Sequence, residues 1–203
     1  MSLLAIGTIA YDDVYTPFGE VKMIEAGSCT YIAMAATQLV KPVQLVSIIG
    51  GEYNQDFLED LKRRGADLEG DEVVPDGKSF YWAGRYHDDM MGRDTLDTQL
   101  NVLADFDPKV PAAYRNADYV MLGNLSPQVQ STVIDQLESK PKLIALDTMN
   151  FWMDIAMEPL KEVLKRIDVL VINDEEARQL SGELSLLKAA TKIVEMGPRI
   201  LII

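Results

Sequence analysis

Short apolar runs alternate with helical stretches along this chain of 203 residues. The runs are rich in Val, Ile and Leu, as expected for strands buried on both faces, and they cover residues 3–10, 43–50, 119–124, 142–147, 169–173 and 199–203. Between them the sequence predicts helices over 27–39, 54–64, 127–137, 159–166 and 185–196, the first of which is apolar nearly all round and should be deeply buried. This alternation predicts an α/β fold: a parallel sheet flanked by helices, with right-handed crossovers.

One segment departs from this pattern. Residues 78–101, "KSFYWAGRYHDDMMGRDTLDTQLN", alternate with a period of two, which places Phe80, Trp82 and Tyr86 on one face of a strand. The turn-forming middle contains Gly92 and precedes a return strand. We therefore predict a β-hairpin inserted at about residues 72–103. A lone hairpin is marginal in water, so its aromatic face must cover the domain, a ligand or a second subunit.

Composition disfavours several classes of protein. The net charge of −13 opposes binding to nucleic acid, and no basic patch compensates for it. No apolar run approaches the roughly 20 residues of a membrane span. The single cysteine, Cys29, excludes an internal disulfide and fits a reducing compartment. We expect a cytoplasmic protein that binds neither nucleic acid nor a membrane.

Four of the predicted strands end in Asp or Asn. Asp12 follows the run 3–10, Asn124 ends the run 119–124, and Asp147 ends the run 142–147 with Asn150 close behind. Asn173 ends the run 169–173, and Glu176 follows it. Ordinary helix caps and turns also favour these residues, and the spacing of Asn173 and Glu176 is that of a capping pair. However, ligands of open α/β sheets bind at the carboxyl ends of the strands. Short Asp and Asn side chains suit a hydroxyl-rich ligand, and carboxylates suit a hydrated Mg²⁺ ion.

The stretch "EAGSCTYIAMAATQL" opens a predicted helix with Gly27 and Ser28, where free N–H groups permit close approach by a ligand. An ordinary helix start with Ser28 as its cap is the alternative. His87, in the hairpin turn, and Cys29, in the small-residue helix, are not expected to be catalytic. The sequence contains neither GxGxxG nor GxxxxGK[ST], which disfavours a nicotinamide-dependent oxidoreductase and a Walker-type phosphate site.

Four motifs occur in an order that resembles the ribokinase-like (PfkB) carbohydrate and nucleoside kinases: "AIGTIAYDD", "EAGSCTYIAMAATQL", "DTMN" and "NDEEARQLSG". The resemblance covers essentially all 203 residues, and the predicted hairpin resembles the lid of that family. It implies a ribokinase-like fold in which Asp12 binds sugar hydroxyls and Gly27 lines the sugar pocket. It also implies that Asn173 and Glu176 organise Mg²⁺ and phosphate, with Glu176 nearest the metal.

Other positions match the family less closely. Asp147 and Asn150 fall where it has Asp-x-Asn, but they are one residue further apart, and Tyr31 replaces an asparagine that binds hydroxyls. Ala26 and Ala10 replace the first glycine of Gly-Gly and a further asparagine. These changes imply a pocket unlike that of ribokinase. We expect a substrate site that includes Asp12, Gly27, Ser28, Tyr31, Trp82, Arg85, Asn124, Asp147 and Asn150.

The resemblance implies ATP-dependent, Mg²⁺-dependent phosphoryl transfer to a hydroxyl of a sugar or nucleoside. The G-A-G-D signature of the family, with its catalytic base, does not occur in these residues, so we expect the base downstream of Ile203 and this chain alone to be inactive. A non-catalytic module that binds a polyol or nucleoside is the alternative. A homodimer formed through the hairpin would also cover its aromatic face.

Overall fold

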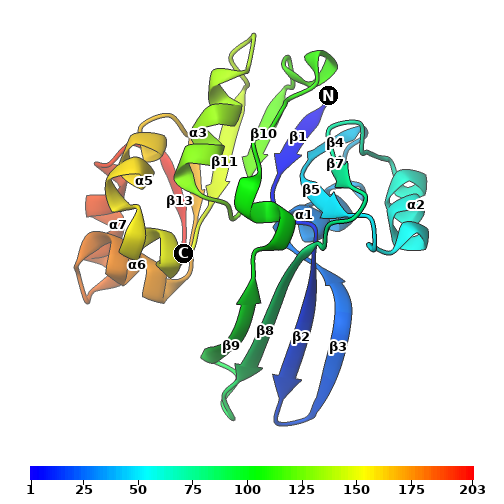
Figure 1. The fold of residues 1–203 in the computed structure, drawn as a ribbon. Helices are drawn as coiled ribbons and strands as arrows, with labels where there is room; N and C mark the ends of the chain where they lie inside the picture. Colours follow the sequence, from blue (N-terminus) through cyan, green and yellow to red (C-terminus); the bar gives the residue numbers. More distant parts are fainter. The chain divides into compact units, whose positions relative to one another are not determined.

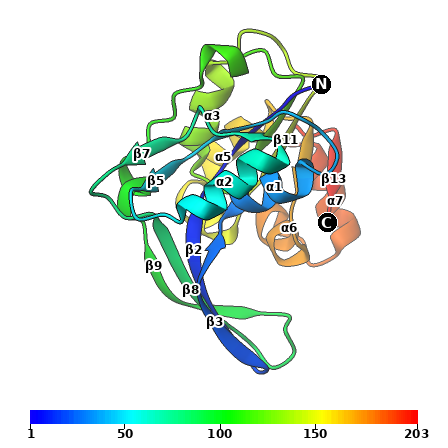
Figure 2. The same ribbon diagram turned by 90° about the vertical axis from the view of Figure 1, so that its right-hand side faces the viewer.

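The computed structural model describes residues 1–203, which form two compact units. The first unit contains residues 1–6 and 108–203, and the second contains residues 7–107. Figures 1 and 2 show the chain from two directions. No helix is long and apolar enough to cross a membrane.

The first unit is an α/β layer. Five parallel strands lie in the order β13 (Ile200–Ile202), β12 (Val169–Val171), β11 (Leu143–Asp147), β10 (Tyr119–Leu122) and β1 (Leu3–Ile6). The helices are α3 (Pro127–Asp135), α4 (Asn150–Ile155), α5 (Met157–Leu164), α6 (Asp174–Ser181) and α7 (Leu186–Val194), with the 3₁₀ turn η2 (Ala112–Tyr114). Figure 1 shows α3, α5, α6 and α7 alongside these strands. The predicted parallel strands and flanking helices are confirmed here.

Local sequence explains where these helices begin. Ser126 caps α3 by accepting the Val129 N–H, and Pro127 follows at the first helical position, where its missing N–H costs nothing. The capping pair predicted at Asn173 and Glu176 opens α6. By contrast, α4 has no side-chain cap and only six residues, and the sequence did not predict it.

The second unit contains a four-stranded sheet in the order β3 (Gly19–Ala26), β2 (Ala10–Thr16), β8 (Phe80–Tyr86) and β9 (Arg93–Gln99). The pairs β2/β3 and β8/β9 are antiparallel, whereas β2 and β8 are parallel (Figure 1). The predicted hairpin therefore exists as β8 and β9. The prediction of one strand over residues 3–10 is wrong, because β1 stops at Ile6 and the chain resumes as β2 at Ala10 in a different sheet.

Two short parallel pairs complete the strands of this unit. They are β4 (Val43–Val46) with β6 (Ala66–Asp67), and β5 (Ile48–Gly50) with β7 (Glu72–Val74). The predicted run 43–50 is thus split at Ser47, whose hydroxyl donates to the Gly7 carbonyl at 2.8 Å. The turn η1 (Asn101–Asp105) follows the sheet.

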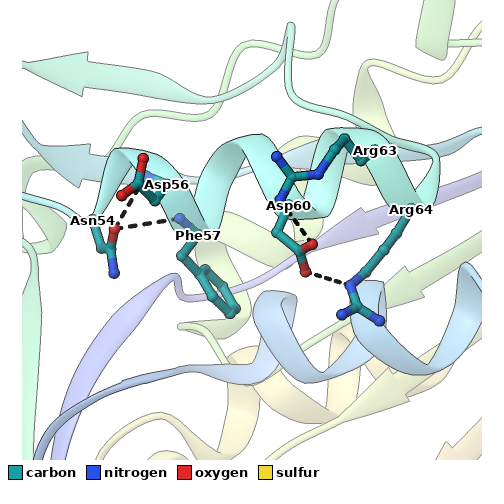
Figure 3. A network of polar contacts seen from close by, with 6 residues as sticks. All are labelled: Asn54, Asp56, Phe57, Asp60, Arg63 and Arg64. Atoms are coloured by element: carbon teal, nitrogen blue, oxygen red, sulfur yellow. Dashed lines mark hydrogen bonds and ion pairs between the residues drawn. The ribbon is translucent and has the colours of Figure 1, made fainter.

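The helices α1 (Ser28–Ala36) and α2 (Gln55–Arg64) lie next to each other in Figure 2. Asn54 caps α2 by accepting the N–H groups of Asp56 and Phe57, and Asp60 pairs with Arg63 and Arg64 (Figure 3). Gly65 ends α2 in the left-handed conformation. The expectation that α1 is deeply buried holds for Cys29, Thr30 and Ala33 only, because Tyr31 is 53% exposed.

Candidate functional site

Asp12 lies in the middle of β2, not in a loop after a strand as the sequence suggested. Its neighbours in the sheet are Ile24 on β3 and Trp82 on β8. Burial, followed by the charge of the adjacent Asp13, raises the pKa of Asp12 to about 6. At neutral pH this carboxylate is ionised and held in a partly desolvated place, where it can accept hydrogen bonds from a polar ligand.

Alternation along β2 and β8 sorts the predicted residues onto two faces. Asp12, Trp82 and Tyr86 share one face, while Arg85 points to the other. On that other face, the Arg85 guanidinium lies 5.9 Å from the ring centroid of Tyr15. Tyr31 belongs with the first group, because burial and then the charges of Asp12 and Tyr86 raise its pKa. The second unit therefore gathers Asp12, Tyr31, Trp82 and Tyr86, without Arg85.

Asp13 is a residue that the sequence prediction left without a role. It is 8% exposed and accepts the backbone N–H of Met23 at 2.8 Å, where the β2–β3 register shifts. Met23 has a positive φ of 51°, which is costly for a side chain of this size. Asp13 therefore stabilises the bulge beside Asp12, and it also bonds Tyr81, whose pKa rises to about 12, chiefly through burial.

Gly27 and Ser28 form a tight turn with Thr8. Gly27 has φ +100°, and a Cβ there would lie 2.3 Å from the Thr8 carbonyl oxygen, so only glycine fits. Ser28 and Thr8 bond reciprocally: the Ser28 hydroxyl accepts the Thr8 N–H at 3.1 Å, and the Thr8 hydroxyl accepts the Ser28 N–H at 3.0 Å. The structure places Gly27, rather than Ser28, at the N-cap of α1.

In the first unit, two carboxylates lie at the carboxyl edge of the strands. Asp147 ends β11 beside Val171 of β12, and Glu176 sits in the first turn of α6, only 6% exposed. Burial and then the Glu176 charge raise the pKa of Asp147 to about 6. The neighbouring Thr148 hydroxyl is buried without a hydrogen-bond partner. A cation would offset the repulsion between these two carboxylates.

The capping box at the start of α6 fixes Glu176. The Glu176 N–H donates to the Asn173 side chain at 2.9 Å, and the Asn173 N–H donates to Glu176 Oε2 at 2.9 Å. Both residues therefore perform the capping role that their spacing allowed. A cap at the end of a buried strand also holds the carboxylate at the edge where α/β folds bind ligands.

The side chains of Asn124 and Asn150 make hydrogen bonds to residues that are distant along the chain. Asn124 accepts the Trp152 indole N–H at 2.8 Å and contacts Met149 Sδ at 3.0 Å, and Asn150 donates to the Gln179 side chain. These bonds hold α4 beside β10 and α6. Gln130, which the sequence did not single out, donates to the carbonyls of Gly123 and Asp147 and so ties the ends of β10 and β11 together.

The chemistry available differs between the two units. No three His, Cys, Asp or Glu side chains cluster as a closed metal site, but Mg²⁺ needs only one or two carboxylates besides water, and Asp147 and Glu176 supply these. In the second unit, one carboxylate among aromatic rings suits a small hydroxylated ligand. Two hollows of the surface lie elsewhere, one beside α5 and α7 and one at the β2–β3 turn, and neither is lined by any of these residues.

Comparison with known proteins agrees with these features. The model of the pfkB family carbohydrate kinases matches residues 9–203. The chain is 22% identical to a cytidine kinase of Thermococcus kodakarensis over 207 residues, which cover 100% of this chain and 72% of that enzyme. Two solved structures share the fold at 16% identity. The first is a Burkholderia thailandensis nucleoside kinase in complex with inosine, which has a TM-score of 0.69; the match covers 94% of this chain and 67% of that kinase. The second is a Cryptococcus neoformans ribokinase in complex with ADP, which has a TM-score of 0.75; the match covers 98% of this chain and 71% of that ribokinase.

Proposed function

Because the chain belongs to the pfkB family of carbohydrate kinases, we propose that the protein transfers the γ-phosphoryl group of ATP to a hydroxyl of a sugar or nucleoside. The observation that carries this proposal is the presence of two partly buried carboxylate sites, one in each unit. Asp12 lies on a partly buried sheet face, and Asp147 lies beside Glu176 at the strand edge. The cytidine kinase and the inosine-bound and ADP-bound relatives support the same classes of ligand.

The second unit supplies the acceptor side. Ionised Asp12 accepts hydrogen bonds from two hydroxyls of the acceptor and so orients the one that reacts. Gly27 lets the Thr8 carbonyl pack closely against the start of α1, and the Thr8–Ser28 pair holds this turn in place. Tyr31 and Trp82 line the same side as Asp12. Arg85, on the opposite face of β8, we no longer place against the acceptor.

The first unit supplies the phosphate side. Asp147 and Glu176 would hold Mg²⁺, directly or through its waters, and Asn173 keeps Glu176 in place. When bound, the metal neutralises charge on the phosphates of ATP. Asn124 and Asn150 then act by positioning α4 rather than by touching the acceptor.

A phosphotransfer assay tests the proposal. Full-length protein that includes the predicted catalytic base is incubated with γ-labelled ATP, Mg²⁺ and a panel of pentoses, hexoses and nucleosides, and labelled products are separated. We expect transfer to at least one acceptor, and loss of transfer in Asp12→Asn and Glu176→Gln. Binding of an acceptor without transfer to any of them would overturn the kinase proposal in favour of a non-catalytic binding module.

A further inference from the structure

The side of the sheet that carries Asp12 also carries an aromatic surface, which we call the aromatic platform: Trp82, Tyr86 and the nearby Tyr31. Trp82 is the direct neighbour of Asp12 on the adjacent strand, where side chains start about 5 Å apart. Tyr31 comes from α1 and is close enough to feel the charges of both Asp12 and Tyr86. A hydroxyl-binding carboxylate and flat rings are thus presented side by side.

The Trp82 ring is held flat on the sheet by specific contacts. Its indole N–H donates to the Thr95 hydroxyl at 3.2 Å. Gly84 lies beneath the ring, since a Cβ at Gly84 would be 1.9 Å from Cη2 of Trp82. The Arg93 guanidinium lies over the ring, 5.8 Å from its centroid. Any side chain at position 84 would therefore displace the ring.

From this juxtaposition we propose that the acceptor is a nucleoside, whose base stacks on the aromatic platform while its ribose hydroxyls bond to Asp12, and that Gly84 is the positioning residue that keeps Trp82 flat. The proposal rests on the proposed function and names its substrate class. A base and its ribose are joined by one bond, which matches the placement of Trp82 directly beside Asp12. A free monosaccharide would satisfy Asp12 and leave most of the platform uncovered.

Aromatic stacking of a base is worth roughly 5- to 150-fold in affinity by alanine substitution. We therefore expect the protein to bind a pyrimidine or purine nucleoside about 5- to 150-fold more tightly than free ribose. Trp82→Ala should weaken nucleoside binding within that range and leave ribose binding unchanged. Gly84→Ala should act in the same direction, because it moves the ring without removing it.

Calorimetric titration with cytidine, inosine and ribose measures these affinities and requires no phosphoryl transfer. An inactive protein that still prefers nucleosides would therefore refute the proposed kinase activity but not this inference. The chain has two tryptophans, so stacking is also visible as quenching of indole emission. Trp82→Phe keeps a flat ring and should retain most of the affinity while abolishing the nucleoside-dependent quenching.

Tyr15→Ala is the matched control, because Tyr15 is an aromatic residue on the opposite face of the same sheet. Tyr15→Ala should change neither the affinity for nucleosides nor the affinity for ribose. Equal affinity for ribose and nucleosides would overturn the proposal. Equal losses of affinity for ribose and nucleosides in Trp82→Ala would also overturn it, because the platform would then contact the sugar and not the base. If Trp82→Ala does not fold, Gly84→Ala and Trp82→Phe decide the question, and unchanged nucleoside binding and quenching in both would also overturn it.

Discussion

Asp71 permits a quantitative prediction about stability. Both of its carboxylate oxygens are buried without a hydrogen-bond partner. The backbone of nearby Ser47 lowers the pKa of Asp71, but by less than burial raises it. Burial, with a smaller effect from Asp67, raises the pKa of Asp71 from 3.8 to about 7. In the unfolded chain the carboxyl ionises near 3.8, whereas the folded protein keeps its proton until about pH 7.

The unfolded state therefore binds fewer protons between these two values, and stability decreases as the pH rises through this window. The difference between these two pKa values corresponds to a loss of about 4 kcal/mol in the free energy of unfolding above pH 7. This is an upper value, because water penetration and relaxation reduce the cost of a buried charge. Asp71→Asn removes the ionisation, so the variant should be more stable than wild type at pH 8 by about 2–4 kcal/mol.

Urea unfolding from pH 5.5 to 8.5 tests this prediction and stays above the pI of about 4.4, where the protein would precipitate. Relative to Asp71→Asn, the free energy of unfolding of the wild type should decrease by about 2 kcal/mol between pH 5.5 and 7. At higher pH the two stability curves should be parallel. Asp76→Asn, an exposed aspartate in the same unit, makes the same change in net charge and should leave the profile unaltered. Parallel curves for wild type and Asp71→Asn over the whole range would refute the argument.

Three further predictions follow from the sites. Gly27→Ala should destabilise the protein by about 1–3 kcal/mol, since φ +100° and the Thr8 carbonyl both exclude a side chain; a smaller change in denaturation midpoint would contradict this. Glu176→Gln should keep the cap and stay within about 0.5 kcal/mol of wild type, whereas Glu176→Ala should lose about 1 kcal/mol, and both should weaken Mg²⁺-dependent nucleotide binding in calorimetry. Acceptor affinity should fall as the pH drops below about 6, where Asp12 takes up its proton, and it should be low and pH-independent in Asp12→Asn.

Sequence patterns located most elements of the first unit correctly, because its strands and helices are regular. The apolar runs at 119–124, 142–147, 169–173 and 199–203 each contain a strand. The spacing of Asn173 and Glu176 predicted the capping box that the structure contains. The helix α4 was missed because nothing in its sequence caps it: its position depends on Asn124 and Gln179, which are distant along the chain.

The second unit was harder to predict because one apolar run conceals a change of sheet. Residues 3–10 read as a single strand, but the Thr8–Ser28 pair and the close approach of Gly27 turn the chain between Ile6 and Ala10. No local rule signals a contact 20 residues away. The Pro17-Phe18-Gly19 turn was an available signal for the β2–β3 hairpin, since alternating residues flank it.

This error affects the reading of the site as well as the fold. As a loop residue, Asp12 would have had no defined neighbours. As the centre of β2, it has Trp82 beside it. Alternation along β8 alone separates Trp82 from Arg85, but only the parallel pairing of β2 with β8 puts Asp12 on the face of Trp82. The sequence therefore identified the chemical groups, and the pairing of strands decided which of them can meet one ligand.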